Sequence, residues 1–245
     1  MKKVALITGA NRGLGFETAR QLAEAGATTI IGARDPAKGE QAAQQLQREG
    51  LDAEAIAIDV DDASIVEAAA KWVQERHGHL DILVNNAGIA PETSSGDARE
   101  IVDADMFRRT FETNVFGAVA VIQWFLPLLR TARSGRIVNV STTMGSLSEQ
   151  LNRSSPYFEA VVPAYQSSKA ALNGITVALS KLLADTPIKV NSVCPGFVKT
   201  DITPINRAQA PLSAEEAAWF VVEMAVLDDD GPTGRFVDRD GPVSW

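Results

Sequence analysis

The sequence is poor in cysteine and in basic side chains relative to acidic ones. One cysteine, Cys194, occurs in 245 residues, so an internal disulfide is impossible and a disulfide-built secreted domain is excluded. We expect Cys194 to behave as a small buried hydrophobe, in a protein of a reducing compartment, the cytoplasm. Asp and Glu outnumber Lys and Arg by 31 to 23, giving a net charge of −8. This balance argues against nucleic acid or an anionic membrane surface as a partner.

Long apolar runs and metal-binding clusters are also lacking. The longest apolar run, residues 115–129, contains Gln123 and Pro127 and is shorter than a membrane span. It predicts a buried core helix. The apolar stretch near the N-terminus is too short for a signal peptide. His77 and His79 stand apart from any cysteine, so we expect no metal site.

Short aliphatic runs alternate with longer helical stretches along nearly the whole chain. The runs at 4–7, 28–31, 55–58, 82–84, 136–140 and 189–193 lack polar alternation, which favours strands buried on both faces of a parallel sheet. Helical composition lies between them, as at 37–49 and 63–76. This pattern predicts an α/β fold, a doubly wound parallel sheet of the Rossmann type with helices on both faces, as one domain over residues 1–245.

Three segments interrupt the alternation: residues 91–103, 143–163 and 197–211. We expect them to be substrate loops, the last of them a mobile loop before a final helix. Three tryptophans fall in helical segments and are expected to be packing anchors: Trp72, Trp124 and Trp219.

A glycine-rich turn follows the first predicted strand and precedes a helix. Its spacing is G-x-x-x-G-x-G, over residues 9–15. Glycines at such a turn let the backbone approach a pyrophosphate, which then lies at the positive end of the helix. A tight turn that needs positive φ is the alternative explanation. The position between strand and helix favours a dinucleotide site made by Gly9, Asn11, Arg12, Gly13, Leu14 and Gly15.

Four motifs, taken in order, resemble the short-chain dehydrogenase/reductase family. After the glycine turn come Asn85-Asn86-Ala87-Gly88, then Tyr165-Gln166-Ser167-Ser168-Lys169, then Pro195-Gly196-Phe197-Val198-Lys199-Thr200. Residues 139–147 and the 240–242 tail are most similar to the carbonyl-reductase-like branch. The resemblance implies a nicotinamide cofactor, and further contacts to it from Asp59, Val60, Asn86, Ala87, Gly88, Pro195, Gly196, Val198 and Thr200. Asn86 has a structural role as its alternative.

The end of the second strand indicates which nicotinamide cofactor is bound. Ala33 stands where an NAD-selective carboxylate would be, and Arg34 follows it. A guanidinium matches the oxygens of a 2′-phosphate, and Arg12 can supply a second cation. Asp35 could instead serve NAD, but its position before Pro36 favours a helix cap. The sequence therefore favours NADPH over NADH.

Tyr165 and Lys169 are four residues apart in a predicted helix over 164–183, so they share one face. A free phenol titrates near about pH 10. A nearby ammonium, together with a cationic nicotinamide, is expected to lower that pKa toward the operating pH. The family resemblance assigns Tyr165 as the proton donor to the carbonyl oxygen. It also assigns Lys169 to the nicotinamide ribose.

The resemblance implies two further polar groups at the reaction centre. Counting back from Gly145 places Thr142 where the family has a serine that orients the substrate oxygen. A threonine hydroxyl can make the same hydrogen bond, although its methyl group restricts χ1. Ser141 is the alternative, and both hydroxyls could instead cap the strand end. Asn114 matches the family asparagine that supports proton relay to the lysine.

The predicted activity is reversible, NADPH-dependent reduction of a ketone or aldehyde to an alcohol. Apolar residues between Thr142 and Tyr165 predict a pocket for a mainly apolar carbonyl substrate: Leu147, Leu151, Tyr157, Phe158, Val161 and Val162. In carbonyl-reductase-like relatives an insertion here can hinder helix-to-helix assembly, so a monomer or a small homo-oligomer is expected. A non-catalytic NADP sensor or scaffold is one alternative, and an epimerase or dehydratase is another.

Overall fold

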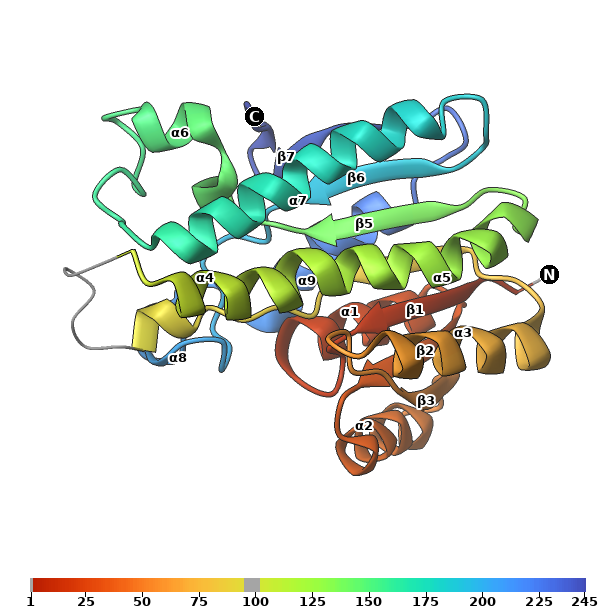
Figure 1. Ribbon diagram of the computed structural model, residues 1–245. Helices are drawn as coiled ribbons and strands as arrows, with labels where there is room; N and C mark the ends of the chain where they lie inside the picture. Colours follow the sequence, from red (N-terminus) through yellow and green to blue (C-terminus); the bar gives the residue numbers. More distant parts are fainter. Residues whose placement is uncertain (1, 95–101) are drawn as a thin grey trace.

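The computed structural model describes residues 2–94 and 102–245. Among these residues the chain forms a single α/β domain built on an eight-stranded sheet, in the order β3-β2-β1-β4-β5-β6-β7-β8 (Figure 1). All neighbouring pairs are parallel except β7 and β8. The strands are β1 Val4–Thr8, β2 Thr28–Ala33, β3 Ala53–Ala57, β4 Ile82–Asn85, β5 Arg136–Val140, β6 Lys189–Val193, β7 Phe236–Asp238 and β8 Gly241–Pro242.

Alternate residues of the central strand face two separate cores. Val4 and Leu6 of β1 pack into one core, and Ala5 and Ile7 pack into the other. This alternation follows from the two-residue period of a strand, and it explains why β1 is apolar throughout. The doubly wound sheet predicted from the sequence is therefore confirmed.

Helices cover both faces of this sheet (Figure 1). The first core receives side chains from α3 Ala63–His77, α5 Ala118–Thr131 and α7 Pro163–Leu182. The second receives them from α1 Gly13–Glu24, α2 Pro36–Arg48 and α9 Ala214–Ala225. The shorter helical elements are η1 Pro91–Ser94, α4 Ala104–Phe111, the π-helix η2 Glu112–Gly117, η3 Thr143–Gly145, α6 Leu147–Leu151 and α8 Pro204–Gln209.

The helical stretch Ala104–Thr131 is long and apolar enough to cross a membrane by length and composition alone. Val121, Phe125 and Leu129 on α5 are fully buried in the first core. The predicted core helix over residues 115–129 is therefore confirmed within this stretch.

Several expected boundaries differ from the structure. Strand β3 starts two residues earlier than predicted, because Ala53 and Glu54 already pair with β2. Strands β7 and β8 were not predicted, and they are too short to give a pattern. Helices α6 and α8 form inside the segments 143–163 and 197–211, which were expected to be loops. Of the segment 91–103, residues 95–101 lie outside the described part of the chain.

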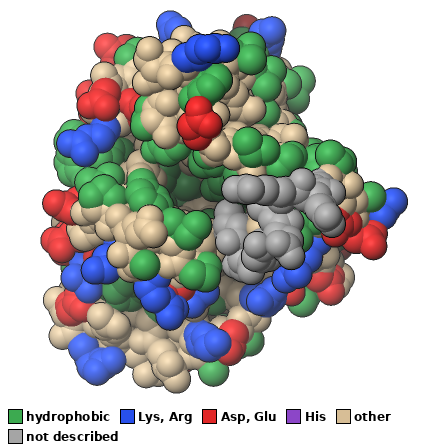
Figure 2. Space-filling model, turned by 90° about the vertical axis from the view of Figure 1, so that its left-hand side faces the viewer, with side chains coloured by type: hydrophobic (Ala, Val, Ile, Leu, Met, Phe, Trp, Pro, Cys, Tyr) green, Lys and Arg blue, Asp and Glu red, His purple; other side chains and the backbone are tan. Residues whose placement is uncertain are grey.

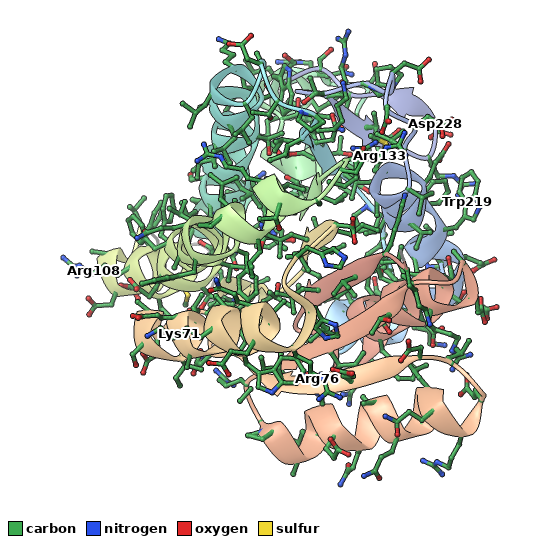
Figure 3. All side chains as sticks on the ribbon, turned by 90° about the vertical axis from the view of Figure 1, so that its right-hand side faces the viewer. Lys71, Arg76, Arg108, Arg133, Trp219 and Asp228 are labelled. Carbon is green, nitrogen blue, oxygen red and sulfur yellow. The ribbon has the colours of Figure 1, made fainter. Side chains whose placement is uncertain are left out.

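The predicted packing role holds for two of the three helical tryptophans. Trp72 and Trp124 pack against the first core. Trp219 contacts Phe220, with ring centroids 5.1 Å apart, but remains 55% exposed. Its side chain projects from the outer side of α9 (Figure 3). The prediction was wrong for Trp219 because α9 buries its other face, through Ala217, Val221 and Met224.

Candidate active site

A cleft of about 1260 Å³ opens at the carboxyl ends of the parallel strands. In the sheet order, β1 lies between β2 and β4, so the direction of winding reverses between β1 and β4. Ligands of doubly wound sheets bind outside the strand ends at such a switch point. Figure 2 looks onto this edge and shows a hollow rimmed by hydrophobic side chains. Every predicted site residue except Asn114 lines the cleft.

The glycine turn forms one end of the cleft and leaves a helix start open. Helix α1 has no side-chain cap and no acidic residue in its first turn. Its first N–H groups are therefore available to an anion. Gly9 and Gly13 have φ of 64° and 56°. A Cβ on Gly15 would lie 2.5 Å from Asn86 Nδ2 and 2.7 Å from the Gly9 carbonyl oxygen. The turn thus fits the pyrophosphate of a dinucleotide.

Thr8 and Asn86 join the glycine turn to the end of β4. The Thr8 hydroxyl oxygen accepts hydrogen bonds from the backbone N–H groups of Asn86 and Ala87, at 3.1 and 3.0 Å. Asn86 Nδ2 donates to the carbonyl oxygens of Thr8 and Gly9, at 2.8 and 3.2 Å. The structural role considered for Asn86 is therefore present. Sequence reasoning missed Thr8, although a threonine ending a buried strand was its signal.

Arg34 and Asp35 follow β2 and differ in their contacts. The Asp35 carboxylate accepts from Ala37 N and Lys38 N, at 3.0 and 3.4 Å, so it caps α2 as predicted. Arg34 is exposed and lines the cleft. Arg12 also lines it, but its guanidinium pairs with Asp201 at 3.1 Å. A 2′-phosphate would meet Arg34 without competition from Asp35.

The remaining predicted cofactor contacts lie along the same cleft. Asp59 and Val60 follow β3, and the Val60 side chain packs against Gly117 of η2, where an added Cβ would lie 2.8 Å from Val60 Cγ2. Gly196 has a φ of 87°, and a Cβ there would lie 2.8 Å from Leu212 Cδ1. Pro195, Val198 and Thr200 line the cleft beside it. These positions match an elongated ligand that runs from the glycine turn to α7.

Tyr165 and Lys169 project from α7 at the other end of the cleft. Lys169 Nζ donates to the Val140 carbonyl oxygen at 2.8 Å and lies 5.9 Å from the centroid of the Tyr165 ring. Burial lowers the pKa of Lys169 to about 8. Burial raises the pKa of Tyr165 above that of a free phenol. In the protein on its own, desolvation of the phenolate therefore dominates. The expected lowering includes the charge of an oxidised nicotinamide and stays a prediction.

Asn114 lies behind the cleft, in the π-helix η2, and is 1% exposed. Its side chain holds both backbone groups of Ile89: Ile89 N donates to Asn114 Oδ1 at 2.8 Å, and Asn114 Nδ2 donates to Ile89 O at 2.9 Å. Nδ2 also donates to Ser168 Oγ at 3.0 Å. A π-turn inside a longer helix frequently marks a functional site. Here it aims Asn114 at the helix that carries Tyr165.

The two neighbouring hydroxyls at the end of β5 differ in access. Ser141 Oγ is buried and has no hydrogen-bond partner among the described residues. Thr142 is half-buried, and its hydroxyl oxygen only accepts a bond from Met144 N, at 3.3 Å. Thr142 can therefore present its O–H to a ligand. Cys194 is buried, as expected, and accepts a hydrogen bond from Thr143.

The segment between Thr142 and Tyr165 supplies only part of the apolar wall predicted for it. Tyr157, Val161 and Val162 line the cleft. Leu147 and Leu151 are 64% and 82% exposed on α6, because that short helix points them to solvent. Phe158 packs instead under Arg153. Other apolar lining comes from Met144, Phe197, Ile202 and Ile205.

His77 and His79 lie at the opposite edge of the sheet and pair with carboxylates. His77 Nε2 is 3.3 Å from Glu54, and His79 Nε2 is 3.3 Å from Asp81. No group of three metal-ligating side chains occurs among the residues that the structure describes.

Glu92 is a site residue that sequence reasoning missed. It lies on η1 and is 7% exposed, and its carboxylate accepts from the backbone N–H groups of Ala164 and Tyr165. A signal was present in the sequence around α7. The residue before this helix is Val162, which cannot cap it, so the partner had to come from elsewhere.

Comparison with known proteins shows the family to which this chain belongs. The family model described as short chain dehydrogenase matches residues 3–210. The chain therefore belongs to the short chain dehydrogenase family. This result confirms the resemblance seen in the sequence motifs.

Individual relatives are similar to this chain over most of its length. The chain is 40% identical over 230 residues to the short-chain dehydrogenase anuI of Penicillium roqueforti, covering 91% of this chain and 88% of the relative. It is 32% identical over 280 residues to carbonyl reductase [NADPH] 1 of Bos taurus, covering 99% and 98%. The crystal structure of an NADPH-bound carbonyl reductase from chicken fatty liver superposes with a TM-score of 0.83 at 28% identity, covering 100% and 99%.

Proposed function

We propose that this protein is an NADPH-dependent reductase of ketones or aldehydes. The main observation in support is that two sets of residues line one cleft. An open helix start and Arg34 lie on the nucleotide side, and Thr142, Tyr165 and Lys169 lie on the reaction side. The bovine and chicken relatives named as carbonyl reductases support the same assignment.

The nucleotide side would hold NADPH through the glycine turn and Arg34. Backbone N–H groups at the start of α1 would bind the pyrophosphate, and the Arg34 guanidinium would bind the 2′-phosphate. The reduced nicotinamide supplies hydride to the carbonyl carbon of the substrate. Lys169 and the backbone of 195–200 line the region where the ribose and carboxamide would lie.

The protein's own residues supply the proton and the orientation. Tyr165 donates its phenolic proton to the carbonyl oxygen as the C=O π-bond breaks, which gives the alcohol. Its raised pKa keeps the phenol protonated at neutral pH, as reduction requires. The Thr142 hydroxyl donates a hydrogen bond to the same oxygen. Lys169, with a pKa of about 8, returns a proton to Tyr165, and Asn114 supports the relay that resupplies Lys169.

The substrate is proposed to be a mainly apolar carbonyl compound. The cleft has apolar lining from Met144, Tyr157 and Val162 and also from Phe197 and Ile202. Such a wall stabilises an apolar ligand by removing its surface from water. The segments 143–163 and 197–211 would therefore act as the substrate loops. We also propose that the protein is cytoplasmic.

The proposal is tested by mixing the protein with NADPH and a panel of ketones and aldehydes while following cofactor absorbance. We expect turnover that Tyr165→Phe abolishes. Absence of turnover on every carbonyl would contradict the proposal, and cofactor binding without turnover would favour a sensor. Retained turnover in Tyr165→Phe would contradict the mechanism.

Cofactor choice is tested with Arg34→Ala. We expect the variant to bind NADPH about 10-fold to 100-fold more weakly while binding NADH as before, because it loses a charge-assisted bond to phosphate. Lys38→Ala is the matched control, since Lys38 is an exposed cation that pairs with Asp35. A preference of the wild type for NADH would contradict this assignment.

A further inference from the structure

Helix α7 begins without a cap of its own. Its N-cap residue is Val162, which makes no side-chain hydrogen bond to the helix, and Tyr165 lies in the first turn. The first N–H groups of a helix need acceptors, and a first turn without them frays. Any fraying here would move the backbone of the residue proposed to donate the proton.

Glu92 supplies the missing acceptor from another part of the chain. Its two carboxylate oxygens lie 3.0 and 3.3 Å from Ala164 N, and one of them lies 3.2 Å from Tyr165 N. The side chain is 7% exposed, so these bonds are shielded from water. A carboxylate at a helix N-terminus also interacts favourably with the helix dipole.

The other side of the Tyr165 backbone is held as well. Ser168 Oγ donates to the Tyr165 carbonyl oxygen at 2.7 Å and accepts from Asn114 Nδ2 at 3.0 Å. Asn114 also holds both backbone groups of Ile89, three residues before Glu92. The segment 89–92 is thus fixed at Ile89 by Asn114, and it reaches α7 through Glu92. Both backbone groups of Tyr165 are hydrogen-bonded to side chains at this place.

We infer that Glu92 is a positioning residue for the proposed reaction. It fixes the first turn of α7 so that the Tyr165 phenol stays in line with the substrate oxygen. Glu92 acts through the backbone of Tyr165 and not by contact with substrate. The inference rests on the proposed function, since it concerns the placement of the same phenol.

The test compares Glu92→Ala and Glu92→Gln with a matched control, Ser213→Ala. Ser213 caps α9 through a bond from Glu216 N at 3.1 Å, and this helix carries no residue of the reaction centre. Three quantities are measured: kcat with one ketone, the Kd of NADPH by fluorescence titration, and hydrogen exchange of peptides that cover the first turns of α7 and α9.

We expect Glu92→Ala to lower kcat about 10-fold to 100-fold, the size of effect that a small misplacement of a reacting group produces. Its Kd for NADPH should stay within about twofold, because the nucleotide side of the cleft is unaltered. Exchange should rise at α7 and not at α9. Glu92→Gln keeps one oxygen acceptor, so its losses should be smaller. Ser213→Ala should show faster exchange at α9 with an unchanged kcat.

Wild-type kcat in Glu92→Ala would overturn the inference, and so would a fall in NADPH affinity parallel to the fall in kcat. If Glu92→Ala does not fold, Glu92→Gln decides: faster exchange at α7 with an unchanged kcat overturns the inference, and a lowered kcat supports it. A wild type without turnover would contradict the proposed function itself. If the wild type turns over and Glu92→Ala has the same kcat, only the role of Glu92 is contradicted.

Discussion

Ser141 and Thr142 are adjacent in the sequence and both line the cleft, but their hydroxyls differ in exposure. Ser141 Oγ is buried, whereas Thr142 is half-buried. We expect Thr142→Ala to lower kcat about 100-fold to 1000-fold, since it removes one donor to the oxygen of the transition state. Thr142→Ser should keep most of the activity.

Ser141→Ala is the control for this prediction and should leave kcat within about twofold of wild type, because no bond to substrate is lost. Steady-state kinetics with one ketone decide between the two hydroxyls. A loss in Ser141→Ala as large as that in Thr142→Ala would show that the assignment is reversed.

Lys169 makes folding stability depend on pH. Burial lowers its pKa from 10.5 to about 8. Below pH 8 the ammonium is charged in both the folded and the unfolded state, so its burial penalty is fully present. Above pH 8 the unfolded chain binds more protons than the folded one, and stability rises with pH. The penalty relieved by pH 10.5 is about 3 kcal/mol.

The matching measurement is urea unfolding of wild type and Lys169→Met between pH 7 and about pH 10. The free energy of unfolding of the wild type should increase relative to the variant as pH rises above 8. Parallel curves over this range would contradict a buried Lys169 with a lowered pKa. Titration of other groups cancels in the difference between the two proteins.

At the scale of elements, the sequence predicts the central strands well and the sheet edge poorly. Strands β5 and β6 have the predicted boundaries. Strands β7 and β8 have three and two residues, and their pairing depends on long-range contacts with β6. Helices α6 and α8 were missed because each is only a few residues long.

In the candidate site, too, local motifs could be predicted and long-range contacts could not. Residues that belong to local motifs, such as the glycine turn and the Tyr165–Lys169 pair, could be found from spacing alone. Thr8 and Glu92 could not be found from spacing, because their hydrogen-bond partners lie 78 and 72 residues away along the chain. The burial that raises the pKa of Tyr165 could not be seen in the sequence either, because it is a property of the folded cleft.

The loss of stability on substituting a glycine by alanine should depend on how crowded that glycine is. Gly9 and Gly50 both have positive φ, 64° and 81°, but only Gly9 is crowded. A Cβ on Gly9 would lie 3.0 Å from Ala87 Cα, whereas a Cβ on Gly50 would meet nothing within 4 Å. Each substitution by alanine should lose about 1–2 kcal/mol to left-handed strain. Gly9→Ala should lose roughly a further 1 kcal/mol to overpacking.

Urea unfolding measures both losses, and NADPH titration should show weaker binding for Gly9→Ala alone. Gly50 lies outside the cleft, so its variant isolates the strain from the crowding. Equal destabilisation of the two variants would mean that β4 does not approach the turn as closely as the structure shows.

At the scale of the whole molecule, the net charge of −8 conceals a local site for a polyanion. The proposed ligand carries several phosphate charges, and it would be met by Arg34, Arg12 and the open start of α1. Arg12 is shared with Asp201 on the segment 197–211. Whole-chain charge therefore describes the general surface, and local geometry determines what the cleft binds.

The oligomeric state is also a property of the whole molecule. The segment between Thr142 and Tyr165 adds the exposed helix α6 beside the cleft, and Leu151 there is 82% exposed. We expect this segment to hinder helix-to-helix association, so that static light scattering gives the mass of a monomer. A constitutive tetramer would contradict this expectation.

We propose that this cleft directs hydride to a carbonyl carbon while Tyr165 supplies the proton. The most direct test of this proposal uses NADPH carrying deuterium at both positions of nicotinamide C4, an apolar ketone and mass spectrometry of the product. The wild type should give an alcohol with deuterium on the carbinol carbon, and Tyr165→Phe should give almost none. An alcohol without deuterium, or equal labelling by Tyr165→Phe, would contradict it.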